Sequence, residues 1–308
     1  MGYKYPTPQL LFKAICNAIR SKTGNSDEIP HQNIPDELDS IIIINEEEYN
    51  IEMQRFIDII EGTSFINDRI TTVKDQLFYY CTSLTTVSIP ECTSIGRLAF
   101  RGCTSLTTVN LPECTSIGST AFNDCTNLTT VNLPKCTSIG SSAFSNCTSL
   151  TTIDLPRCTS IGESAFYNCT SLTTVNLPEC NSIGYSAFGS CTSLTTVNLP
   201  KCTSIGEYAF RDCTNLTTVN LPECTSIGRY AFVGCNNLTT IILSNNQVAT
   251  LDNNAFYSSS IVNGAGYVYV PDNLVNSYKT ATKWSTYADQ IKPLSELPSN
   301  LKEEYGYD

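Results

Sequence analysis

Histidine, tryptophan and methionine are scarce in this sequence. The 308 residues include one histidine, one tryptophan and two methionines. His31 lies in a polar stretch beside Pro30. Catalysis by histidine needs a partner base or nucleophile within hydrogen-bond reach. We therefore expect a surface role for His31, no catalytic residues and no enzyme activity.

Long apolar runs and clusters of positive charge are also missing. The longest uncharged apolar run, Ile41–Ile44, is far too short to span a membrane, so membrane insertion is not expected. Eighteen basic residues stand against 29 acidic ones, which gives a formal net charge of −11. Because the basic residues form no patch, a nucleic-acid partner is not expected either.

The sequence shows no ligand-binding loop and no leader pattern. No glycine-rich loop follows a strand pattern, and the carboxylates lack the spacing of a calcium loop, so we predict no cofactor and no metal. Near the N-terminus, Lys13, Asn17 and Arg20 interrupt the apolar residues where a signal peptide would have an apolar segment. We therefore expect the chain to fold in a reducing cytoplasm.

One phrase, by contrast, is abundant. Residues 103–118 read CTSLTTVNLPECTSIG, and nearly the same letters return again and again. Phenylalanine recurs every 22 residues, at Phe78, Phe100, Phe122, Phe144, Phe166, Phe188, Phe210 and Phe232. A cysteine follows each of them by three residues, and a second cysteine series lies halfway between. A fixed period of this length indicates a solenoid of stacked coils.

Each coil is predicted to begin with a short strand. Leu128, Val131 and Leu133 point inward from this strand in the coil that we use as an example. Thr130 and Asn132 then point outward, because successive side chains of a strand face opposite sides. Pro134 follows and ends the strand, since proline cannot donate to the hydrogen-bond ladder.

The rest of the coil is predicted to return to the core. Cys136 occupies a corner, Ile139 re-enters the core, and Gly140 makes a bend that a side chain would hinder. Ala143 and Phe144 are expected to form one helical or 3₁₀ turn, in which the small residue leaves room for the ring. One coil cannot bury these side chains alone, so we expect coils to stack at about 4.8 Å each.

Three explanations compete for the regular cysteines. Equivalent cysteines would have Cα atoms about 4.8 Å apart, within disulfide range, but each would have two equal neighbours and no specific partner. Metal sites favour close pairs such as C-x-x-C, which the sequence lacks. We favour buried thiols that donate S–H to a carbonyl of the next coil, with disulfides and a metal array as alternatives.

The repeat itself resembles a known family. The unit L-x-x-V-x-L-P-x-C-x-x-I fits the leucine-rich repeat consensus with one extra residue. The longer phrase TSIGxxAFxxCTSLTTVNLP, over residues 63–256, resembles the BspA-like leucine-rich repeats of surface proteins from gut and oral anaerobes. The resemblance implies an α+β fold built on a right-handed solenoid with a parallel β-sheet on one face. It also implies adhesion or protein binding, without catalytic residues.

The two ends resemble a narrower group. Residues 10–41 are similar to an N-terminal module of tail-fibre-like proteins from phages and prophages of such bacteria. Residues 266–294 are similar to a segment that closes many of these arrays. The resemblance implies a location in the virion tail if a phage encodes the chain, and otherwise at the cell surface or outside the cell.

Four regions follow from these patterns. Residues 1–62 are expected to be a helical region that caps the array, or that attaches it by docking or by homo-oligomerisation. Residues 63–258 are the solenoid, of eight or nine coils. Residues 259–294 are expected to be a β-α cap, with Trp284 sealing the last coil. Residues 295–308 are expected to be a polar tail.

Two surfaces are candidate binding sites. The outward residues of the strands form what we call the polar ladder: Thr130, Asn132, Thr152, Asp154, Thr174, Asn176, Thr196 and Asn198. The turns carry what we call the aromatic strip: Tyr185, Tyr208, Tyr230 and Arg229. Tyrosine and arginine are favoured at recognition surfaces. The alternatives are that the ladder only bonds to itself and that the strip is part of solvated, variable loops.

Three functions are consistent with these surfaces. The first is a non-enzymatic adhesin or tail-fibre-like protein that binds a protein or glycan receptor on a cell. The second is a structural spacer in a virion or surface assembly, which the near-identical coils favour. The third is a binder of ice or crystal surfaces, for which the regular ranks of outward threonines are the relevant feature.

Overall fold

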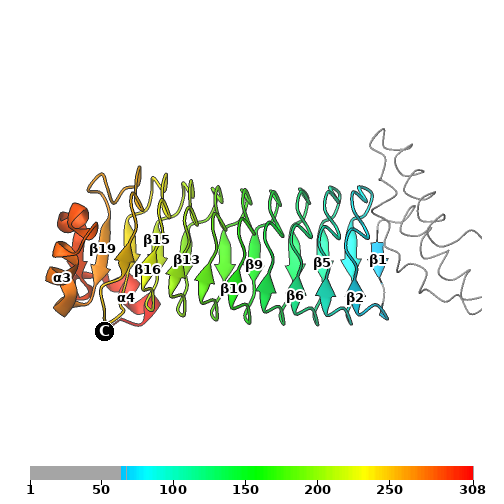
Figure 1. Ribbon diagram of the computed structural model, residues 1–308, viewed down its shortest axis with the longest axis horizontal. Coiled ribbons are helices and arrows are strands. Elements are labelled where there is room, and N and C mark those ends of the chain that lie inside the picture. The colour runs from blue at the N-terminus through cyan, green and yellow to red at the C-terminus, as the bar shows by residue number, and fades with distance from the viewer. Residues whose placement is uncertain (1–63, 67, 308) are drawn as a thin grey trace, which may run out of the picture.

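The computed structural model describes residues 64–66 and 68–307, which stack as coils along one axis (Figure 1). The predicted helical region 1–62 lies outside the described residues. Each coil of 22 residues contributes two short strands, and the strands pair in parallel with their equivalents in at least one neighbouring coil. Val109, for example, pairs with Val131, and Ile139 pairs with Ile161. The predicted parallel-strand solenoid is therefore confirmed.

The first strand of each coil carries the T-V-N triplet or its equivalent. These strands are β1 (Ser64–Ile66), β3 (Thr86–Ser88), β5 (Thr108–Asn110), β7 (Thr130–Asn132), β9 (Thr152–Asp154), β11 (Thr174–Asn176), β13 (Thr196–Asn198), β15 (Thr218–Asn220) and β17 (Thr240–Ile242). Their pairing is interrupted between β7 and β9 and again between β11 and β13. We call the outer surface of these strands the strand face.

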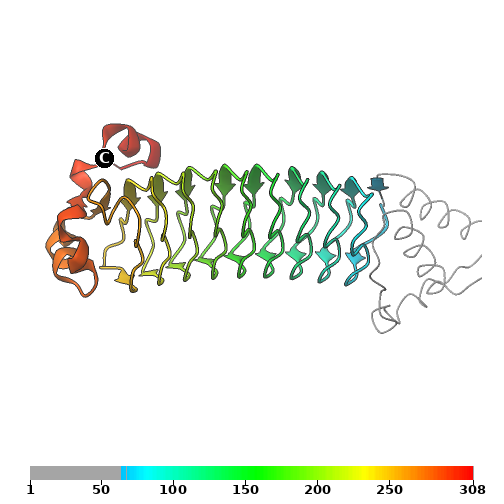
Figure 2. The ribbon, with the colours of Figure 1, turned by 90° about the horizontal axis from the view of Figure 1, so that it is seen from above.

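The second strand of each coil was not predicted. It consists of two residues, usually Ser-Ile, as in β2 (Thr72–Val73), β4 (Ser94–Ile95), β6 (Ser116–Ile117), β8 (Ser138–Ile139), β10 (Ser160–Ile161), β12 (Ser182–Ile183), β14 (Ser204–Ile205), β16 (Ser226–Ile227) and β18 (Thr250–Leu251). These strands form one continuous nine-stranded sheet. A two-residue strand is too short for alternation to be recognised in the sequence, since one inward and one outward residue define no period. Figure 2 shows the two sets of strands on different sides of the stack.

A column of stacked phenylalanines fills the centre. From Phe78 to Phe256, the ring centroids of successive coils lie 4.9–5.8 Å apart, with interplanar angles of 16° or less. The alanine before each repeat phenylalanine is fully buried from Ala99 to Ala255. The small residue therefore leaves room for the ring, as predicted, and the apolar area buried by this column stabilises the array together with the buried leucine and isoleucine columns.

The turn around each phenylalanine differs from the expected helical or 3₁₀ turn. Residues two positions before and after the ring have left-handed φ values, for example 55° at Ser142 and 61° at Asn146. Alternate N–H groups bond outside their own turn: Phe144 N donates to the carbonyl of Ala165 in the next coil at 2.8 Å, whereas Ser145 N donates three residues back, to the carbonyl of Ser142, at 3.2 Å. The turns thus form a third ladder between coils, in addition to the short-range hydrogen bonds within each turn.

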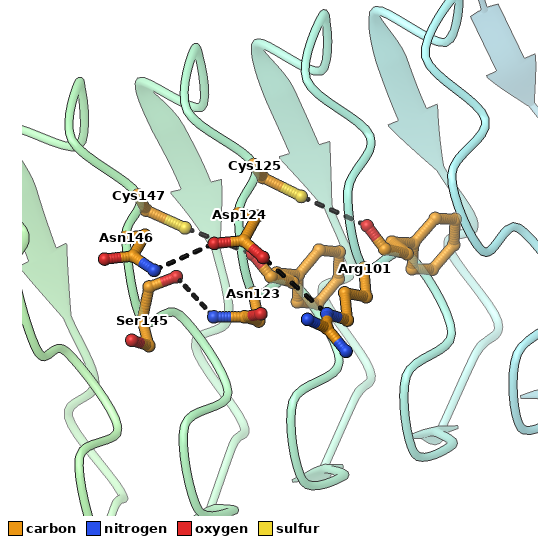
Figure 3. A network of polar contacts seen from close by, with 9 residues as sticks. Arg101, Asn123, Asp124, Cys125, Ser145, Asn146 and Cys147 are labelled. Atoms are coloured by element: carbon orange, nitrogen blue, oxygen red, sulfur yellow. Dashed lines mark hydrogen bonds and ion pairs between the residues drawn. The ribbon is translucent and has the colours of Figure 1, made fainter. Parts of the chain in front are cut away.

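Side chains continue this third ladder. Asn146 Nδ2 donates to Asp124 Oδ1 in the preceding coil at 2.8 Å, and Asn168 Nδ2 donates to Asn146 Oδ1 at 2.9 Å (Figure 3). Arg101 Nε lies 3.6 Å from Asp124 Oδ2 at the N-terminal end of the row (Figure 3). Asparagine and aspartate tolerate the left-handed backbone better than most residues, which explains their presence at this position.

The fifteen described cysteines are free thiols, and fourteen of them are buried. Those after each phenylalanine donate S–H to the preceding coil, as Cys125 does to the carbonyl of Phe100 at 3.2 Å (Figure 3). Those halfway between donate within their own coil, as Cys136 does to the carbonyl of Ser138 at 3.3 Å. The prediction of core thiols that donate to carbonyls is confirmed, but the expected direction toward the next coil is wrong.

The C-terminal cap extends the strand face and then covers the last coil. It comprises β19 (Tyr267–Val270), η3 (Asp272–Leu274), α3 (Val275–Thr280), η4 (Trp284–Gln290) and β20 (Ile291–Pro293). Both strands pair in parallel with the sheet of β17. Trp284 and Tyr278 are buried, and their polar groups bond the backbone of Ala249, which precedes the edge strand β18. The predicted sealing role of Trp284 is confirmed.

The expectation of a polar tail at residues 295–308 is wrong. Residues 294–296 form η5 (Leu294–Glu296) and residues 299–305 form α4 (Ser299–Tyr305), which lies beside the last coils (Figure 1). Leu297 is 3% exposed and packs with Ile242 and Tyr269. Leu297 is extended and lies between η5 and α4, so these leucines form no continuous helix face, and the predominantly polar sequence around them gave no periodic signal.

We expect Tyr307→Phe to loosen this C-terminal segment. The hydroxyl of Tyr307 donates to Asn220 Oδ1 at 2.9 Å and lies 3.0 Å from Ser244 Oγ. Its loss leaves the buried Asn220 without this donor, which should cost about 1–2 kcal/mol. Hydrogen exchange of residues 299–307 should accelerate, while exchange in β9 and β11 stays unchanged. Unaltered exchange in both regions would contradict the role of this contact.

Candidate functional site

The polar ladder is exposed along β7, β9, β11 and β13. Its amide column is partly self-bonded: Asn132 Nδ2 donates to Asn110 Oδ1 and Asn176 Nδ2 donates to Asp154 Oδ1, both at 2.7 Å. The side chain of Asp154 has no N–H group that could donate to Asn132. The hydrogen-bonded column is therefore interrupted between these two residues. This break coincides with the break in backbone pairing between β7 and β9. The ladder therefore offers unpaired acceptors at this point of the strand face.

The threonine column of the ladder differs from its asparagine column. Within the described residues, the hydroxyls of Thr152, Thr174 and Thr196 make no hydrogen bond to the protein, and all three residues are exposed. The neighbouring column is satisfied in part: Thr173 Oγ1 donates to the carbonyl of Thr151 at 3.1 Å, whereas the hydroxyls of Thr151 and Thr195, beside the two breaks in strand pairing, make no hydrogen bond among the described residues. One rank of threonine hydroxyls thus remains available to a ligand or to water.

The C-terminal segment sets where the ladder ends. Thr218 and Asn220 of β15 are 7% and 4% exposed, because the C-terminal segment covers this part of the strand face. At the next rung, Ile242 replaces the asparagine and packs under Leu297. The ladder residues from Thr130 to Asn198 all lie on the part that remains exposed. The same pattern also places Thr218 and Asn220 outward, and for these two residues the expectation of an exposed position is wrong.

The structure brings the residues of the aromatic strip together. The rings of Tyr185 and Tyr208 meet edge to face at a centroid distance of 5.7 Å, and those of Tyr208 and Tyr230 stack at 5.2 Å. The Arg229 guanidinium lies 4.8 Å from the centre of the Tyr230 ring, within the range of a cation–π contact. The strip is thus one continuous surface across three coils.

Two neighbours of the strip were missed in the sequence. The ring of Tyr257 lies 6.5 Å from that of Tyr230, edge to face, and 58% of this residue is exposed. Arg211 lies 5.8 Å from the centre of the Tyr208 ring. Tyr257 follows the point where the 22-residue period slips, so counting from the repeat did not place it beside Tyr230.

The backbone of the strip shows that the fold does not require these rings. Tyr208 and Tyr230 have φ values of 57° and 54°, in the left-handed region that bulky residues rarely adopt. Equivalent positions in three consecutive coils are occupied by Ser142, Ser164 and Ser186 with the same backbone. Leu98 and Thr120 occupy the same position in earlier coils, again with left-handed φ values, so the fold accepts varied side chains here and does not require a tyrosine.

Hydrogen bonds and charges hold the strip in place. Asn254 Nδ2 donates to the Tyr230 hydroxyl at 3.1 Å, and this donor lowers the pKa of Tyr230, with the Arg229 guanidinium as a further cause. The side-chain hydrogen bond between Arg229 and Tyr230 is in turn the largest cause that raises the pKa of Arg229. The backbone N–H of Tyr208 donates to the carbonyl of Arg229 at 3.0 Å. The strip is therefore a preorganised surface, which reduces the entropy lost on binding.

The ladder and the strip are two separate surfaces. The ladder lies on the first strand of each coil, whereas the strip lies on the turns that follow the strands of the nine-stranded sheet. Among residues 64–66 and 68–307, histidine, cysteine and acidic residues form no group of three or more that would hold a metal ion. No helix in the same part of the chain has the length and apolar character of a membrane crossing.

Stacked coils with in-register parallel strands and a leucine-phenylalanine core define a leucine-rich repeat solenoid. The model of the BspA-type leucine-rich repeat region matches residues 71–183 and 159–274. The chain belongs to this family. Proteins with this fold are generally non-enzymatic scaffolds that bind other proteins or ligands, and BspA-type proteins are usually found at the cell surface or outside the cell.

Solved structures of leucine-rich repeat proteins are similar to this chain. A leucine-rich cell surface protein of Faecalibacterium prausnitzii A2-165 has 22% identity and a TM-score of 0.40, covering 78% of this chain and 86% of that protein. A leucine-rich repeat protein of Bacteroides ovatus has 20% identity and a TM-score of 0.43, covering 75% and 84%. One from T. pallidum has 27% identity and a TM-score of 0.36, covering 70% and 82%. A search of curated proteins gave no match.

Proposed function

We propose that this protein is a recognition protein whose solenoid binds a protein or glycan receptor on a cell surface through the aromatic strip. The observation that carries the proposal is the presence of Tyr208 and Tyr230 at left-handed positions where other coils have serine. Rings that the fold does not need, held in a fixed array beside Arg229 and Arg211, have the composition of binding hot spots.

The polar ladder supports the proposal as a second contact surface. Its free threonine hydroxyls and the acceptors around Asp154 suit hydroxyl- or amide-rich ligands such as glycans and peptides. The self-bonded parts of the amide column favour the structural spacer instead, because those groups are already satisfied. The regular rank of threonine hydroxyls is the feature that an ice or crystal-surface binder would use.

The tail-fibre form of the proposal depends on the ends of the chain. In that form, residues 1–62 attach or oligomerise the protein in a virion tail, and the solenoid contacts the host cell. The resemblance of residues 10–41 and 266–294 to tail-fibre-like proteins supports it. In the other form, the protein acts at the surface of the cell that produces it.

Binding to intact cells tests the proposal. Fluorescently labelled protein is incubated with a panel of anaerobic gut bacteria, and the variant Tyr208→Ser/Tyr230→Ser is compared with the natural chain. Because each hot-spot tyrosine contributes about 2 kcal/mol or more, we expect the affinity of the double variant to fall at least tenfold. Serine at these positions is compatible with the fold, as Ser142, Ser164 and Ser186 show.

Tyr80→Ser is the matched control. Tyr80 is also an exposed tyrosine with a left-handed φ of 57°, but it lies several coils from the strip, and Ser190 occupies its equivalent position. Binding should be unchanged by this substitution. An equal loss of affinity in Tyr208→Ser/Tyr230→Ser and in Tyr80→Ser would show that the strip is not the binding site. A lack of binding to every strain would favour the structural spacer.

A further inference from the structure

A column of charged residues follows one corner of the solenoid. From the coil of Glu91 onward, one of these residues comes directly after the proline that ends each first strand, and its equivalent in the next coil lies 22 residues further along. Arg69 occupies the same position in the first coil, after Asp68. In chain order the column, which we call the corner charges, consists of Arg69, Glu91, Glu113, Lys135, Arg157, Glu179, Lys201 and Glu223. Its members lie at intervals of about 4.8 Å, because parallel strands have this spacing.

Some corner charges are paired within the chain and others are not. Lys135 Nζ bonds Glu113 Oε1 at 2.7 Å, and Lys201 Nζ bonds Glu179 Oε1 at 2.8 Å. Glu91 and Arg157 are exposed and have no ion pair or side-chain hydrogen bond among the described residues. These two opposite charges lie three coils apart, too far to meet within one molecule.

We propose that two copies of this protein pair side by side and antiparallel along the corner charges. A two-fold axis between the coils of Glu113 and Lys135 places Glu91 opposite Arg157 of the second copy. The same axis places Glu113 opposite Lys135 of the second copy, and Arg69 opposite Glu179. All six residues from Arg69 to Glu179 then face an opposite charge, and the symmetry generates each contact twice.

This arrangement sets more opposite charges against each other than any other register of the column. An axis between Glu179 and Lys201, for comparison, pairs only Glu179 with Lys201 and Arg157 with Glu223. If the axis moves by half a coil in one direction, Glu113 faces Glu113 of the second copy. If it moves by half a coil in the other direction, Lys135 faces Lys135 of the second copy. A parallel arrangement in register would set identical charges against each other at every coil. Like charges across an interface cost several times more than an exposed ion pair gains, so the column excludes these alternatives as well as favouring one.

The geometry of the solenoid permits the contact. The coils stack along a straight axis (Figure 2). The six charges recur every 22 residues, at the same position of each coil, so they follow one edge of the stack. The prolines that precede the charges, such as Pro112, Pro134 and Pro156, are at least partly exposed and add a rigid apolar row beside them. Exposed ion pairs are individually weak, so the charges set orientation and the dimer should be weak and salt-dependent.

Charge exchange tests this pairing in the full-length protein. Sedimentation velocity is measured over a concentration series at about 0.01 M salt, where the Debye length is about 30 Å, and at about 1 M, where it is about 3 Å. We expect dimers at low salt and monomers at high salt. Glu91→Arg and Arg157→Glu should each weaken dimerisation at least tenfold, because each places like charges opposite one another twice. The double variant Glu91→Arg/Arg157→Glu should restore it.

Glu223→Arg is the control for net charge. Glu223 belongs to the same column and is exposed, but it lies outside the six paired positions, so this substitution should leave the dimer unchanged. Dimerisation that resists both single exchanges, or that the double variant fails to restore, would overturn the proposal, as would a monomer at every salt concentration. The variants leave the aromatic strip intact, so cell binding by the strip is tested independently of the dimer.

Discussion

Raising the pH from about 8 to about 10 is expected to unfold this protein. Fourteen of the described cysteines are buried thiols. Burial raises the pKa of Cys114 and Cys202 to about 12 and that of Cys158 to about 11, against an ordinary value of 9.0. For all three, desolvation of the thiolate is the largest cause.

The sign follows from proton binding in the two states. Between the unfolded and folded pKa values, the unfolded chain has lost protons that the folded chain keeps, so the free energy of unfolding falls as pH rises. Each thiol loses about 1.4 kcal/mol of stabilisation one pH unit above its unfolded pKa. Fourteen thiols together lose about 20 kcal/mol, more than the 5–15 kcal/mol that stabilises a typical domain. Stability is retained below about pH 8.

Urea unfolding followed by circular dichroism at stepped pH, with reductant present, measures this effect. The chain offers its own matched control, because Ser259 occupies the cysteine position in the last coil and is fully buried. We expect the replacement of Cys125, Cys147 and Cys169 by serine to make the free energy of unfolding depend less on pH. The reduction in slope should correspond to about three fewer protons released on unfolding. A free energy of unfolding that stays constant up to about pH 10 would contradict the presence of buried thiols.

Trp284→Ala is expected to cost about 3–5 kcal/mol and to unfold the C-terminal coils first. The indole is 1% exposed, its Nε1–H donates to the carbonyl of Ala249 at 2.7 Å, and its ring lies 5.1 Å from that of Tyr278. It also packs against Phe256, the last ring of the phenylalanine column. Since coils contact only their neighbours, the loss of the cap exposes the end of the column.

Thermal unfolding and hydrogen exchange measure this loss. Exchange should accelerate most in residues 240–257 and least around β9. Trp284→Phe keeps most of the packing but leaves the Ala249 carbonyl without its donor, so it should cost about 1–3 kcal/mol. Tyr257→Ser, at a residue that is 58% exposed, should change stability by less than about 0.5 kcal/mol. Equal effects of Trp284→Ala and Tyr257→Ser would show that the cap does not stabilise the array.

Much of the repeat could be predicted because its information is local. Leu128, Leu133 and Phe144 are buried as the sequence indicated, since each coil buries them against copies of itself. Val131 and Val175 are exceptions, being only half-buried beside the two breaks in strand pairing. Nothing in their coils distinguishes Val131 and Val175 from the fully buried Val109 or Val219, so these breaks could not be predicted.

The candidate sites could be predicted only in part. The positions of Tyr208 and Tyr230 in the repeat indicated that their side chains would be neighbours, and their rings do stack. The left-handed backbone of these two tyrosines could not be predicted, because it depends on hydrogen bonds from each turn to the next coil. This backbone is the observation that distinguishes a role in recognition from a role in folding. Single-coil reasoning assigned a helical turn there because it considered only bonds within the turn.

The sequence alone determined the period, the coil, the buried thiols and the candidate residues, because these depend on spacing that repeats every 22 residues. Tertiary structure alone decided how far the polar ladder extends. Tyr307 reaches Asn220 across 87 residues of sequence, and Leu297 covers Ile242. Contacts between residues so far apart leave no pattern in the local sequence. They form only because the cap folds and directs α4 back along the strand face. The exposed part of the ladder is therefore a property of the folded chain and not of the repeat.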